Sequence, residues 1–313
     1  MPPAPPQSDA PGGSWSDWLT DRLLRGLIAG ALLLPWTTRT RLMGWLVRRV
    51  VAPLAGWRAR ARANLAHVWP DMPEAERRRI ADAAADNAGR TMIENYDIAG
   101  LKARAAAAPI GGEGLALLER AHAAGEPVLL VTGHFGNHEI PRAALVARGL
   151  QVGGLYRPMK NRYFNDHYAA NMHALSGPVF EQGRRGTMGL VRHIREGGIG
   201  VLLFDLYAGR GAPVDFLGKP APTLTSAAEI ALKTGAHVIP FFGIRQPDGL
   251  HFEIAFEAPV PHGDPVKMTR DMTRRLEARV RADPGQWFWI HRRWKPERQA
   301  ARQRKRAAAS TAP

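Results

Sequence analysis

The spacing of apolar residues divides the chain into an N-terminal helical part and a longer part in which helices alternate with short strands. Residues 14–57 contain two apolar segments, Gly26–Trp36 and Leu42–Trp57, with tryptophans and arginines beside them. From about Gly112 onward, short apolar runs bounded by glycine, proline or asparagine alternate with segments of helical period. Such runs are typical of strands that are covered on both faces. The pattern therefore predicts an α/β domain with a central sheet flanked by helices.

The predicted strands and helices can be located from these runs. Strands are expected at Pro127–Gly133, Leu150–Tyr156, Gly200–Asp205, Val238–Ile244 and His251–Phe256. Helices are expected at Arg58–Trp69, Glu74–Ile98, Leu115–Ala123, Asn161–Leu175, Gly186–Glu196, Thr225–Thr234 and Met268–Arg281. The last two strands flank a Pro247-Asp-Gly249 turn, which predicts a hairpin and hence a mixed sheet.

Composition sets the expected boundaries of the folded part. Residues 1–13 are rich in proline, glycine and alanine, and we expect them to be disordered. Residues 297–313 form a basic, alanine-rich tail for which we also expect disorder. Between them we expect N-terminal helices over residues 14–57 and one domain over residues 58–296. No charged start leads into an apolar core and a cleavage site, so no signal peptide is visible.

The N-terminal helices have the composition of a membrane-attachment segment. Tryptophans at the ends of apolar runs, with arginines alongside, are typical of helices that lie in a membrane interface. The run Gly26–Trp36 is shorter than the roughly 20 residues that span a bilayer. Two alternatives remain: a tilted single span whose polar ends reach the interface, and two amphipathic helices packed on the domain.

The formal charge of +15 and the isoelectric point near 11.0 indicate an anionic partner. Nucleic acid, an anionic membrane lipid, a phosphorylated lipid and an acidic carrier protein all fit the charge. An organism that favours arginine throughout its proteome is the alternative explanation, because the arginines are spread along the whole chain. The chain contains no cysteine, which excludes disulfides, thiolate metal sites and cysteine nucleophiles.

The residues from Val128 to Arg142 carry the clearest candidate chemistry. A buried strand leads through Gly133 and Gly136 into a helix for which Asn137 is a suitable N-cap. His134 then lies at the carboxyl end of the strand and Glu139 in the first turn of the helix. In open α/β sheets, ligands bind in the crevice at this edge.

This placement predicts general-base catalysis. His134 can take a proton, and Glu139 can hold the ring in one tautomer and stabilise the imidazolium. Backbone N–H groups at the Gly133–Gly136 turn can stabilise an oxyanion. Neither a cysteine nor a G-x-S-x-G nucleophile is present, so the attacking hydroxyl belongs to the substrate and no acyl-enzyme forms.

Two other kinds of site can be compared with this prediction. His134 and His138 are four residues apart beside Glu139, but Gly136 and Asn137 interrupt the helix that a two-histidine metal site requires, so we expect no metal. A basic nucleic-acid-binding module fits the charge, but no recognised binding motif supports it, and we expect no nucleic acid as partner.

The motif His134-Phe-Gly-Asn-His-Glu139 resembles the H-x4-D/E motif of the glycerolipid acyltransferases. It is most similar to the bacterial lipid A late acyltransferases of the lauroyl and myristoyl type, where this stretch usually reads H-F-G-N-W-E. His138 stands here in place of the tryptophan. The resemblance implies a glycerolipid acyltransferase-like fold with His134 and Glu139 as the catalytic pair.

Further blocks extend the resemblance over roughly residues 60–296, in the same order. Tyr156–Asn161 is similar to a block whose arginine is assigned to the phosphorylated acceptor, which implies that role for Arg157 and makes Lys160 a neighbour. Asp205 stands where the family usually has Asp-Gln, here followed by leucine. It could orient Arg157, bind the acceptor or cap the following loop. Asn137 and Lys160 are further candidate contacts to substrate. Thr234–Pro240 and Gln286–Lys295 also resemble family blocks.

The resemblance implies the reaction and its partners. The donor would be a fatty acyl thioester of acyl carrier protein or coenzyme A, used as co-substrate without a further cofactor. The acceptor would be a hydroxyl of a phosphorylated lipid, first of all a lipid A precursor at the cytoplasmic face of the inner membrane. A lysophospholipid or ornithine-lipid acceptor is the alternative within the class.

Overall fold

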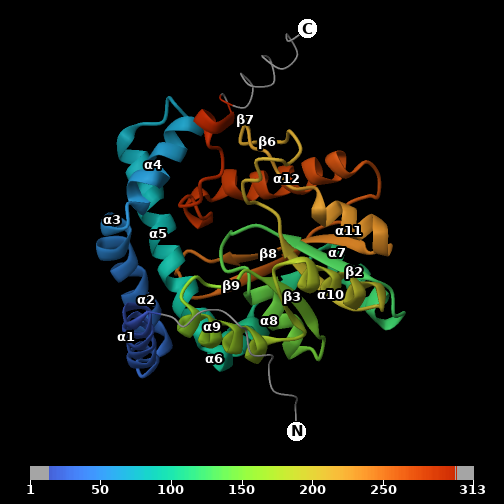
Figure 1. The fold of residues 1–313 in the computed structure, drawn as a ribbon, viewed down its shortest axis with the longest axis horizontal. Coiled ribbons are helices and arrows are strands. Elements are labelled where there is room, and N and C mark those ends of the chain that lie inside the picture. Colours follow the sequence, from blue (N-terminus) through green and yellow to red (C-terminus); the bar gives the residue numbers. More distant parts are fainter. Residues whose placement is uncertain (1–13, 300, 302–313) are drawn as a thin grey trace.

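A seven-stranded sheet forms the centre of the molecule in the computed structural model, which describes residues 14–299 and residue 301 (Figure 1). The strand order is β1-β9-β8-β2-β5-β3-β4. All neighbouring strands are parallel except β8 and β9, which are antiparallel. The prediction of an α/β fold with a mixed central sheet is therefore confirmed.

The strands that the apolar runs predicted are all present, with shifted ends. They are β2 Val128–Thr132, β3 Val152–Tyr156, β5 Ile199–Leu203, β8 His237–Arg245 and β9 Phe252–Phe256. The sequence did not predict β1 Ile110–Gly111, β4 Val179–Glu181 and the small hairpin of β6 Asp215–Phe216 and β7 Lys219–Pro220. These strands have two or three residues, too few to show an apolar period.

Helices connect and cover the strands. From residue 57 onward they are α4 Trp57–Val68, α5 Glu74–Tyr96, α6 Ile98–Ala107, α7 Glu113–Ala123, α8 Ile140–Ala147, α9 Arg162–Leu175, α10 Arg184–Arg195, α11 Ser226–Thr234 and α12 Pro265–Ala282. The helix predicted at Glu74–Ile98 is α5, which ends at Tyr96, and the sequence did not predict α6, whose first residue is Ile98. The chain turns at Asp97, whose side chain accepts a hydrogen bond from the N–H of Gly100 and starts α6.

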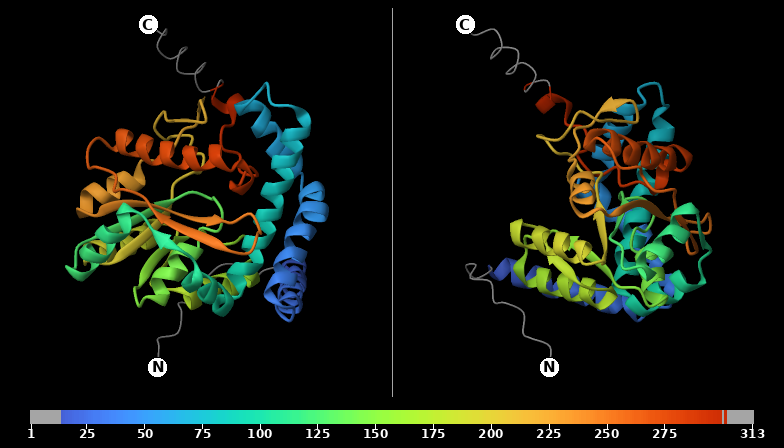
Figure 2. Two further views of the ribbon diagram at one scale, coloured as in Figure 1. Left: turned by 180° about the vertical axis from the view of Figure 1, so that it is seen from behind. Right: turned by 90° about the vertical axis from the view of Figure 1, so that its right-hand side faces the viewer.

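The two faces of the sheet pack against different helices, as the views of Figure 2 show. Alternate residues of a strand point to opposite faces. Leu129 and Val131 of β2 therefore pack in a core that α10, α11 and α12 share with the C-terminal tryptophans. Val128 and Leu130 pack in a second core that includes residues of α6, α7 and α8. The strand at the centre is buried on both sides, which explains its uninterrupted apolar sequence.

The N-terminal helices lie against the domain. They are α1 Trp15–Leu32, α2 Trp36–Leu46, a π-helical turn at Val47–Val51 and α3 Ala52–Leu54. α2 runs so close to α5 that a Cβ on Gly89 would lie 2.4 Å from the carbonyl oxygen of Met43. α1 contacts α9, where the Asn161 amide donates to the carbonyl oxygen of Asp17 at 2.7 Å. Residues 14–57 therefore share a packed interface with the domain.

No helix among residues 14–299 is long and apolar enough to cross a bilayer. The disorder expected for residues 1–13 falls outside the described residues. The tail differs from expectation where it begins, because residues 296–299 are helical and Gln299 donates to the carbonyl oxygen of Pro220 at 3.1 Å. The remainder of the tail, apart from residue 301, lies outside the described residues.

A buried ion pair joins α5 to the end of β8. Arg245, the last residue of β8, donates from Nη1 and Nη2 to the two carboxylate oxygens of Glu94 at 2.6 and 2.7 Å. Glu94 is fully buried and Arg245 is nearly so. A bidentate pair of this kind fixes both distance and orientation. It therefore holds α5 across the carboxyl end of β8, which is also the carboxyl edge of β2.

Removing the charge of Glu94 should strongly destabilise the protein. Glu94→Gln leaves the buried Arg245 guanidinium without its counter-charge, and we expect the free energy of unfolding to fall by about 3 kcal/mol or more. Glu196→Gln is the matched control, because Glu196 pairs with Arg192 at the exposed surface and should cost less than about 1 kcal/mol. Urea unfolding of both variants measures the difference, and equal losses would show that the buried pair does not hold the fold.

Candidate active site

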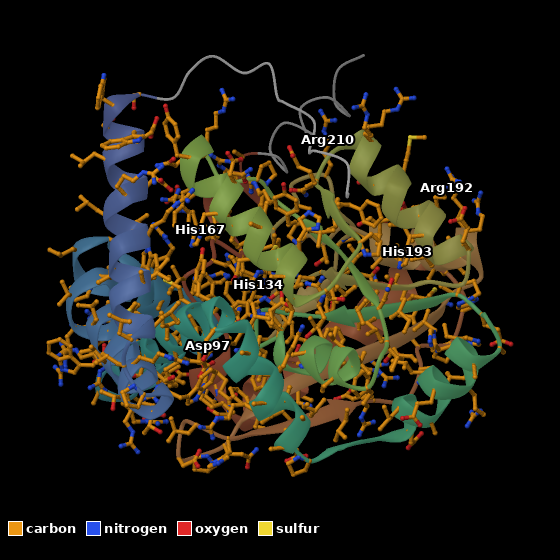
Figure 3. All side chains as sticks on the ribbon, turned by 90° about the horizontal axis from the view of Figure 1, so that it is seen from below. Asp97, His134, His167, Arg192, His193 and Arg210 are labelled. Atoms are coloured by element: carbon orange, nitrogen blue, oxygen red, sulfur yellow. The ribbon has the colours of Figure 1, made fainter. Side chains whose placement is uncertain are left out.

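His134 and Asp205 follow two neighbouring parallel strands at the same edge of the sheet. Thr132, the last residue of β2, pairs with Leu203, the last residue of β5. Each strand is followed two residues later by one of the polar side chains. His134 Nδ1 lies 2.7 Å from Asp205 Oδ1. The register of the two strands thus builds a histidine–carboxylate pair, and Figure 3 shows His134 near the middle of the molecule.

The carboxylate of Asp205 is almost fully buried and has all its partners within the protein. Oδ2 accepts the backbone N–H of His134 at 2.8 Å and the indole N–H of Trp287 at 3.0 Å. Burial alone would favour the neutral carboxyl, but the charge and hydrogen bonds of His134 hold the pKa of Asp205 well below its usual range. Asp205 is therefore an anion at neutral pH.

An ionised carboxylate at Nδ1 determines the tautomer of His134. Because the carboxylate only accepts, Nδ1 carries the proton and Nε2 is left with a lone pair. The side chain of His134 is 25% exposed and lines a cavity of about 400 Å³. The ring can therefore accept a proton from a molecule bound in the cavity.

The expected pairing of His134 with Glu139 is wrong in this structure. Glu139 lines the same cavity, but its carboxylate faces Arg142 Nη1 at 3.4 Å and His138 Nε2 at 3.9 Å. The local turn explains the difference. Asn137 Oδ1 accepts the N–H of Glu139 at 3.0 Å and α8 begins only at Ile140. Glu139 is thereby placed beside the buried Arg142 and not against the His134 ring.

The side chain of Asn137 has a structural role in the loop after β2. It is fully buried, and its amide nitrogen donates to Glu94 Oε2 at 3.0 Å. With its oxygen bonded to the N–H of Glu139, both polar atoms of the side chain have protein partners. The contact of Asn137 with substrate stays a prediction, and in this structure its polar atoms are used within the protein. Asn137 instead connects the loop after β2 to the buried Glu94–Arg245 pair.

The two glycines of the loop form the turn that the sequence predicted. Gly136 has φ +57°, and a Cβ there would lie 1.9 Å from the carbonyl oxygen of Gly243. A Cβ on Gly133 would meet the side chain of Leu276 at 2.6 Å. Only glycine fits at Gly136, where both the backbone angle and the space exclude a side chain.

Most backbone N–H groups of this loop donate to acceptors within the protein. The N–H of Gly136 donates to the carbonyl oxygen of Gln286 at 3.0 Å, so it cannot serve as the expected oxyanion donor in this conformation. The N–H of Asn137 donates to the carbonyl oxygen of Gly243 at 3.0 Å. Within the described chain, the N–H of His138 has no acceptor. Because His138 also lines the cavity, this donor remains open to a ligand.

Arg157 and Lys160 follow β3, which neighbours β5, so they lie at the predicted edge of the sheet. Both side chains are exposed, and neither lines the cavity that holds His134. The arginine in the cavity wall is Arg142, which is buried and donates to the carbonyl oxygens of Val152 and Ser176. Arg157 therefore lies at the same edge of the sheet as His134, as expected, but it does not line the cavity that holds His134.

The C-terminal block Gln286–Lys295 contributes the residues of the site that sequence reasoning missed. It runs antiparallel to the loop after β2, with Phe135 facing Trp287. The N–H of Phe288 donates to the carbonyl oxygen of His134 at 3.0 Å. Aromatic and basic residues made this block distinctive in the sequence, but neither periodicity nor spacing could place it beside His134.

Three histidine rings gather at the cavity. The ring centroids of His134 and His291 are 4.5 Å apart, and those of His134 and His138 are 5.5 Å apart. Burial, with the charge of His134 acting in the same direction, lowers the pKa of His291 to about 3. Burial also lowers the pKa of His138, against the opposing effect of Glu139. His291 is therefore neutral at physiological pH, and its ring places no second positive charge beside His134.

The rest of the cavity wall is largely apolar. It includes Trp57, Met92, Met159, Met172, Leu175 and Phe288. Flexible methionines adapt to irregular apolar shapes. A cavity with this wall and a histidine–carboxylate pair at one side suits a substrate that joins a hydrocarbon chain to a reactive polar group. In the described part of the chain, no three or more histidine, cysteine, aspartate or glutamate side chains are arranged so that they could hold a metal ion.

The chain is similar to several known acyltransferases. The family model for bacterial lipid A biosynthesis acyltransferases matches residues 11–296. A lipid A biosynthesis acyltransferase of Haemophilus influenzae is 24% identical over 281 residues, which are 88% of this chain and 86% of the relative. The lipid A biosynthesis lauroyltransferase of Escherichia coli is 25% identical over 240 residues, 74% of this chain and 77% of that protein. A phosphatidylinositol mannoside acyltransferase of Mycobacterium tuberculosis is 25% identical over 248 residues, 74% and 76% of the two chains.

The protonation of Asp205 should make its contribution to stability depend on pH. Its pKa is lower in the folded than in the unfolded chain, so its stabilisation is present above the unfolded pKa of about 3.9 and is lost as pH falls further. Asp205→Asn should therefore lower the free energy of unfolding by about 2 kcal/mol at pH 7. The difference from the parent protein should shrink below about pH 4. Unfolding measured from pH 3 to 8 checks this, and a difference independent of pH would refute the charged pair.

Proposed function

The chain belongs to the bacterial lipid A biosynthesis acyltransferase family and is an O-acyltransferase, and we propose that it moves a fatty acyl chain from a thioester to a hydroxyl of a phosphorylated lipid. The main support is the His134–Asp205 pair beside an apolar cavity. The pair supplies a base of defined tautomer, and the cavity supplies a surface for a hydrocarbon chain. We take the acceptor to be a lipid A precursor, in agreement with the names of several relatives.

In the proposed reaction, Nε2 of His134 takes the proton of the acceptor hydroxyl. The oxygen attacks the thioester carbonyl, forms the new C–O bond and leaves a negative charge on the carbonyl oxygen. When the C–S bond breaks, the imidazolium returns its proton to the departing sulfur. Asp205 keeps the ring in place and stabilises the imidazolium between these steps. The hydroxyl is the nucleophile, so no acyl-enzyme is formed.

The groups around His134 can stabilise the charges that develop during this reaction. The N–H of His138 lacks an acceptor within the described chain and is our candidate donor to the oxyanion. His291 is neutral, so no second positive ring opposes protonation of His134. Glu139 adds negative charge in the same cavity without bonding the ring. We therefore assign Glu139 an electrostatic role in the catalytic site, in support of the His134–Asp205 pair.

The acceptor's phosphate is proposed to lie outside the cavity. Arg157 and Lys160 are exposed at the same sheet edge as His134 and follow the neighbouring strand β3. Arginine binds phosphate with two parallel hydrogen bonds, and lysine adds a point charge. A headgroup held by these side chains would leave its acyl chains free to enter the apolar cavity. A lysophospholipid or ornithine-lipid acceptor would use the same base.

We also propose that the protein binds the cytoplasmic face of the inner membrane through the outer side of α1. Trp15, Leu19 and Leu23 are 84%, 53% and 65% exposed on that helix. Leu27 continues the row and is 48% exposed. Apolar side chains that remain exposed at helical spacing are suited to an interface with lipid. α1 stands at one side of the molecule, with its inner side against α9 (Figure 3).

Replacing His134 should abolish transfer without unfolding the protein. We expect His134→Ala to lower kcat by about a thousandfold, because the general base is lost. His122→Ala, on the exposed side of α7, is the matched control and should retain full activity. The assay offers lauroyl and myristoyl thioesters of acyl carrier protein and of coenzyme A to a lipid A precursor and to lysophospholipids. Undiminished transfer by the His134→Ala protein would refute the assignment of the base.

The products of the same assay decide between acceptors. Transfer to the lipid A precursor would support the first assignment. Transfer only to lysophospholipid would keep the mechanism and replace the acceptor. Transfer to neither, by a folded protein, would contradict both acceptor assignments.

Polar substitutions on the outer side of α1 should weaken membrane binding. The triple variant Leu19→Ser, Leu23→Ser and Leu27→Ser changes three exposed apolar side chains that belong to none of the hydrophobic clusters, so the fold should persist. We expect at least a tenfold loss of sedimentation with vesicles that contain anionic lipid, because each exposed leucine loses apolar contact with the bilayer. Leu224→Ser, which is 54% exposed elsewhere, is the control. Unchanged sedimentation of the triple variant would place the attachment on another surface.

A further inference from the structure

A groove with basic walls lies between α10 and α11, apart from the cavity of His134. Its volume is about 1020 Å³, more than twice that of the active-site cavity. The basic side chains that line it are Arg184, Arg192, Arg195 and Lys233. All four are exposed. Figure 3 shows Arg192 and His193 of α10 at one side of the molecule, with α1 at the other side and His134 between them.

Three of these four cations have no acidic partner among the described residues, whereas several arginines of other helices are paired. On α12, Arg274 pairs with Asp271 and Arg281 with Glu277, each at 2.7 Å. In the groove, Glu196 pairs with Arg192 at 2.8 Å. For Arg184, Arg195 and Lys233, no ion pair exists within the described residues. Two carboxylates, Glu196 and Glu229, also line the groove, so its four basic and two acidic side chains leave a net positive charge of two.

The charge at the start of α10 does not serve the stability of the helix. Arg184 and Arg185 occupy its first turn, which contains no acidic residue, and the N-cap is Gly183 without a side-chain hydrogen bond. The helix N-terminus carries a partial positive charge, so two arginines there are unfavourable. An anionic surface placed against this end would remove the repulsion. This arrangement indicates a role in binding.

Apolar groups lie among these cations. Met188 is 63% exposed, although it is a large apolar side chain. Val191 and Ile230 line the groove and are half-buried. A flexible methionine between basic side chains suits a partner that presents both acidic and apolar residues on one helix. Phosphate or another small anion would leave Met188 without a partner.

The topology places one end of this groove at the edge of the sheet that holds His134. β4 is parallel to β3 and ends at Glu181, shortly before α10 begins at Arg184. α10 has 12 residues and therefore extends about 18 Å back from that edge. A partner lying along α10 would have one end close to the active-site edge. α1, with its exposed leucines, stays free on the other side for contact with lipid.

We propose that the α10–α11 groove is the docking surface for an acidic acyl carrier protein, which presents its thioester toward His134. The proposal rests on the proposed function, since it names the donor of that reaction. Charge complementarity brings the acidic partner to the groove, and the apolar side chains add contact area. A carrier protein has the helical, acidic surface that this groove fits. Coenzyme A, which has no such surface, would reach the active site without using the groove.

The test compares charge reversals inside and outside the groove in the full-length protein. The groove variant is Arg184→Glu/Arg195→Glu. The control is Arg120→Glu/Lys267→Glu, which makes the same change in net charge at exposed positions of α7 and α12 that have no ion pair in the described part of the chain. Transfer kinetics are measured with acyl carrier protein and coenzyme A thioesters of the same chain. Binding of the carrier protein without an acyl chain is measured separately by fluorescence anisotropy.

We expect the groove variant to raise KM for the carrier-protein donor by about tenfold or more and to weaken binding of the carrier protein by a similar factor. Its kinetics with the coenzyme A donor should match those of the parent protein, and the control variant should resemble the parent with both donors. Binding of carrier protein to the parent should also weaken as salt rises, because the contacts are electrostatic.

Several results would overturn the proposal. Equal KM values for parent and groove variant with the carrier-protein donor would exclude docking in the groove. Equal losses with both donors would show that these arginines support the fold or the chemistry. If the groove variant instead lost binding to anionic vesicles while its carrier-protein kinetics stayed normal, the groove would be a membrane surface. If the parent transferred from neither donor but bound carrier protein through the groove, docking would stand and the proposed function would fail.

Discussion

The hydrogen bond between His134 and Asp205 is the interaction on which the rest of the site depends. It joins the ends of two adjacent strands, at the edge where open sheets bind ligands. The buried carboxylate is tolerated because the His134 ring, the His134 backbone and the Trp287 indole all donate to it. The bond sets the tautomer of the base, and the Trp287 indole, which donates to the same carboxylate, attaches the C-terminal block to the sheet.

The surrounding framework keeps this pair in place. Asn64 of α4 donates to the carbonyl oxygens of Trp289 and His291 at 2.7 and 2.8 Å, which fixes the C-terminal block from the side opposite the sheet. Arg293 is buried and donates to Thr223 Oγ1 at 2.6 Å, which ties that block to the segment between β7 and α11. These polar side chains join segments that are distant in sequence. The groups that can contact a ligand are the few that line the cavity.

The sequence predicted the fold class and the edge of the sheet that holds the site, because both follow from local apolar runs and from the glycine turn at Gly136. It placed His134 correctly at the end of β2. It did not predict that Asp205 would be its partner, because that contact depends on the parallel register of β2 and β5, whose residues are 71 positions apart at the contact. Glu139 was closer in sequence, but the turn made by Asn137 directs it toward Arg142. Sequence proximity was therefore a poor guide to the hydrogen-bonded pair.

The most direct test of the account is the protonation of the His134 ring, observed by NMR with ¹⁵N-labelled histidine. In its neutral form, the ring of the parent protein should carry its proton on Nδ1 and none on Nε2. Glu139→Gln should leave this tautomer unchanged, whereas Asp205→Asn should abolish it, since Asp205 alone bonds Nδ1 in the described structure. A tautomer that survives Asp205→Asn but is lost in Glu139→Gln would contradict the account and restore Glu139 as the partner of the base.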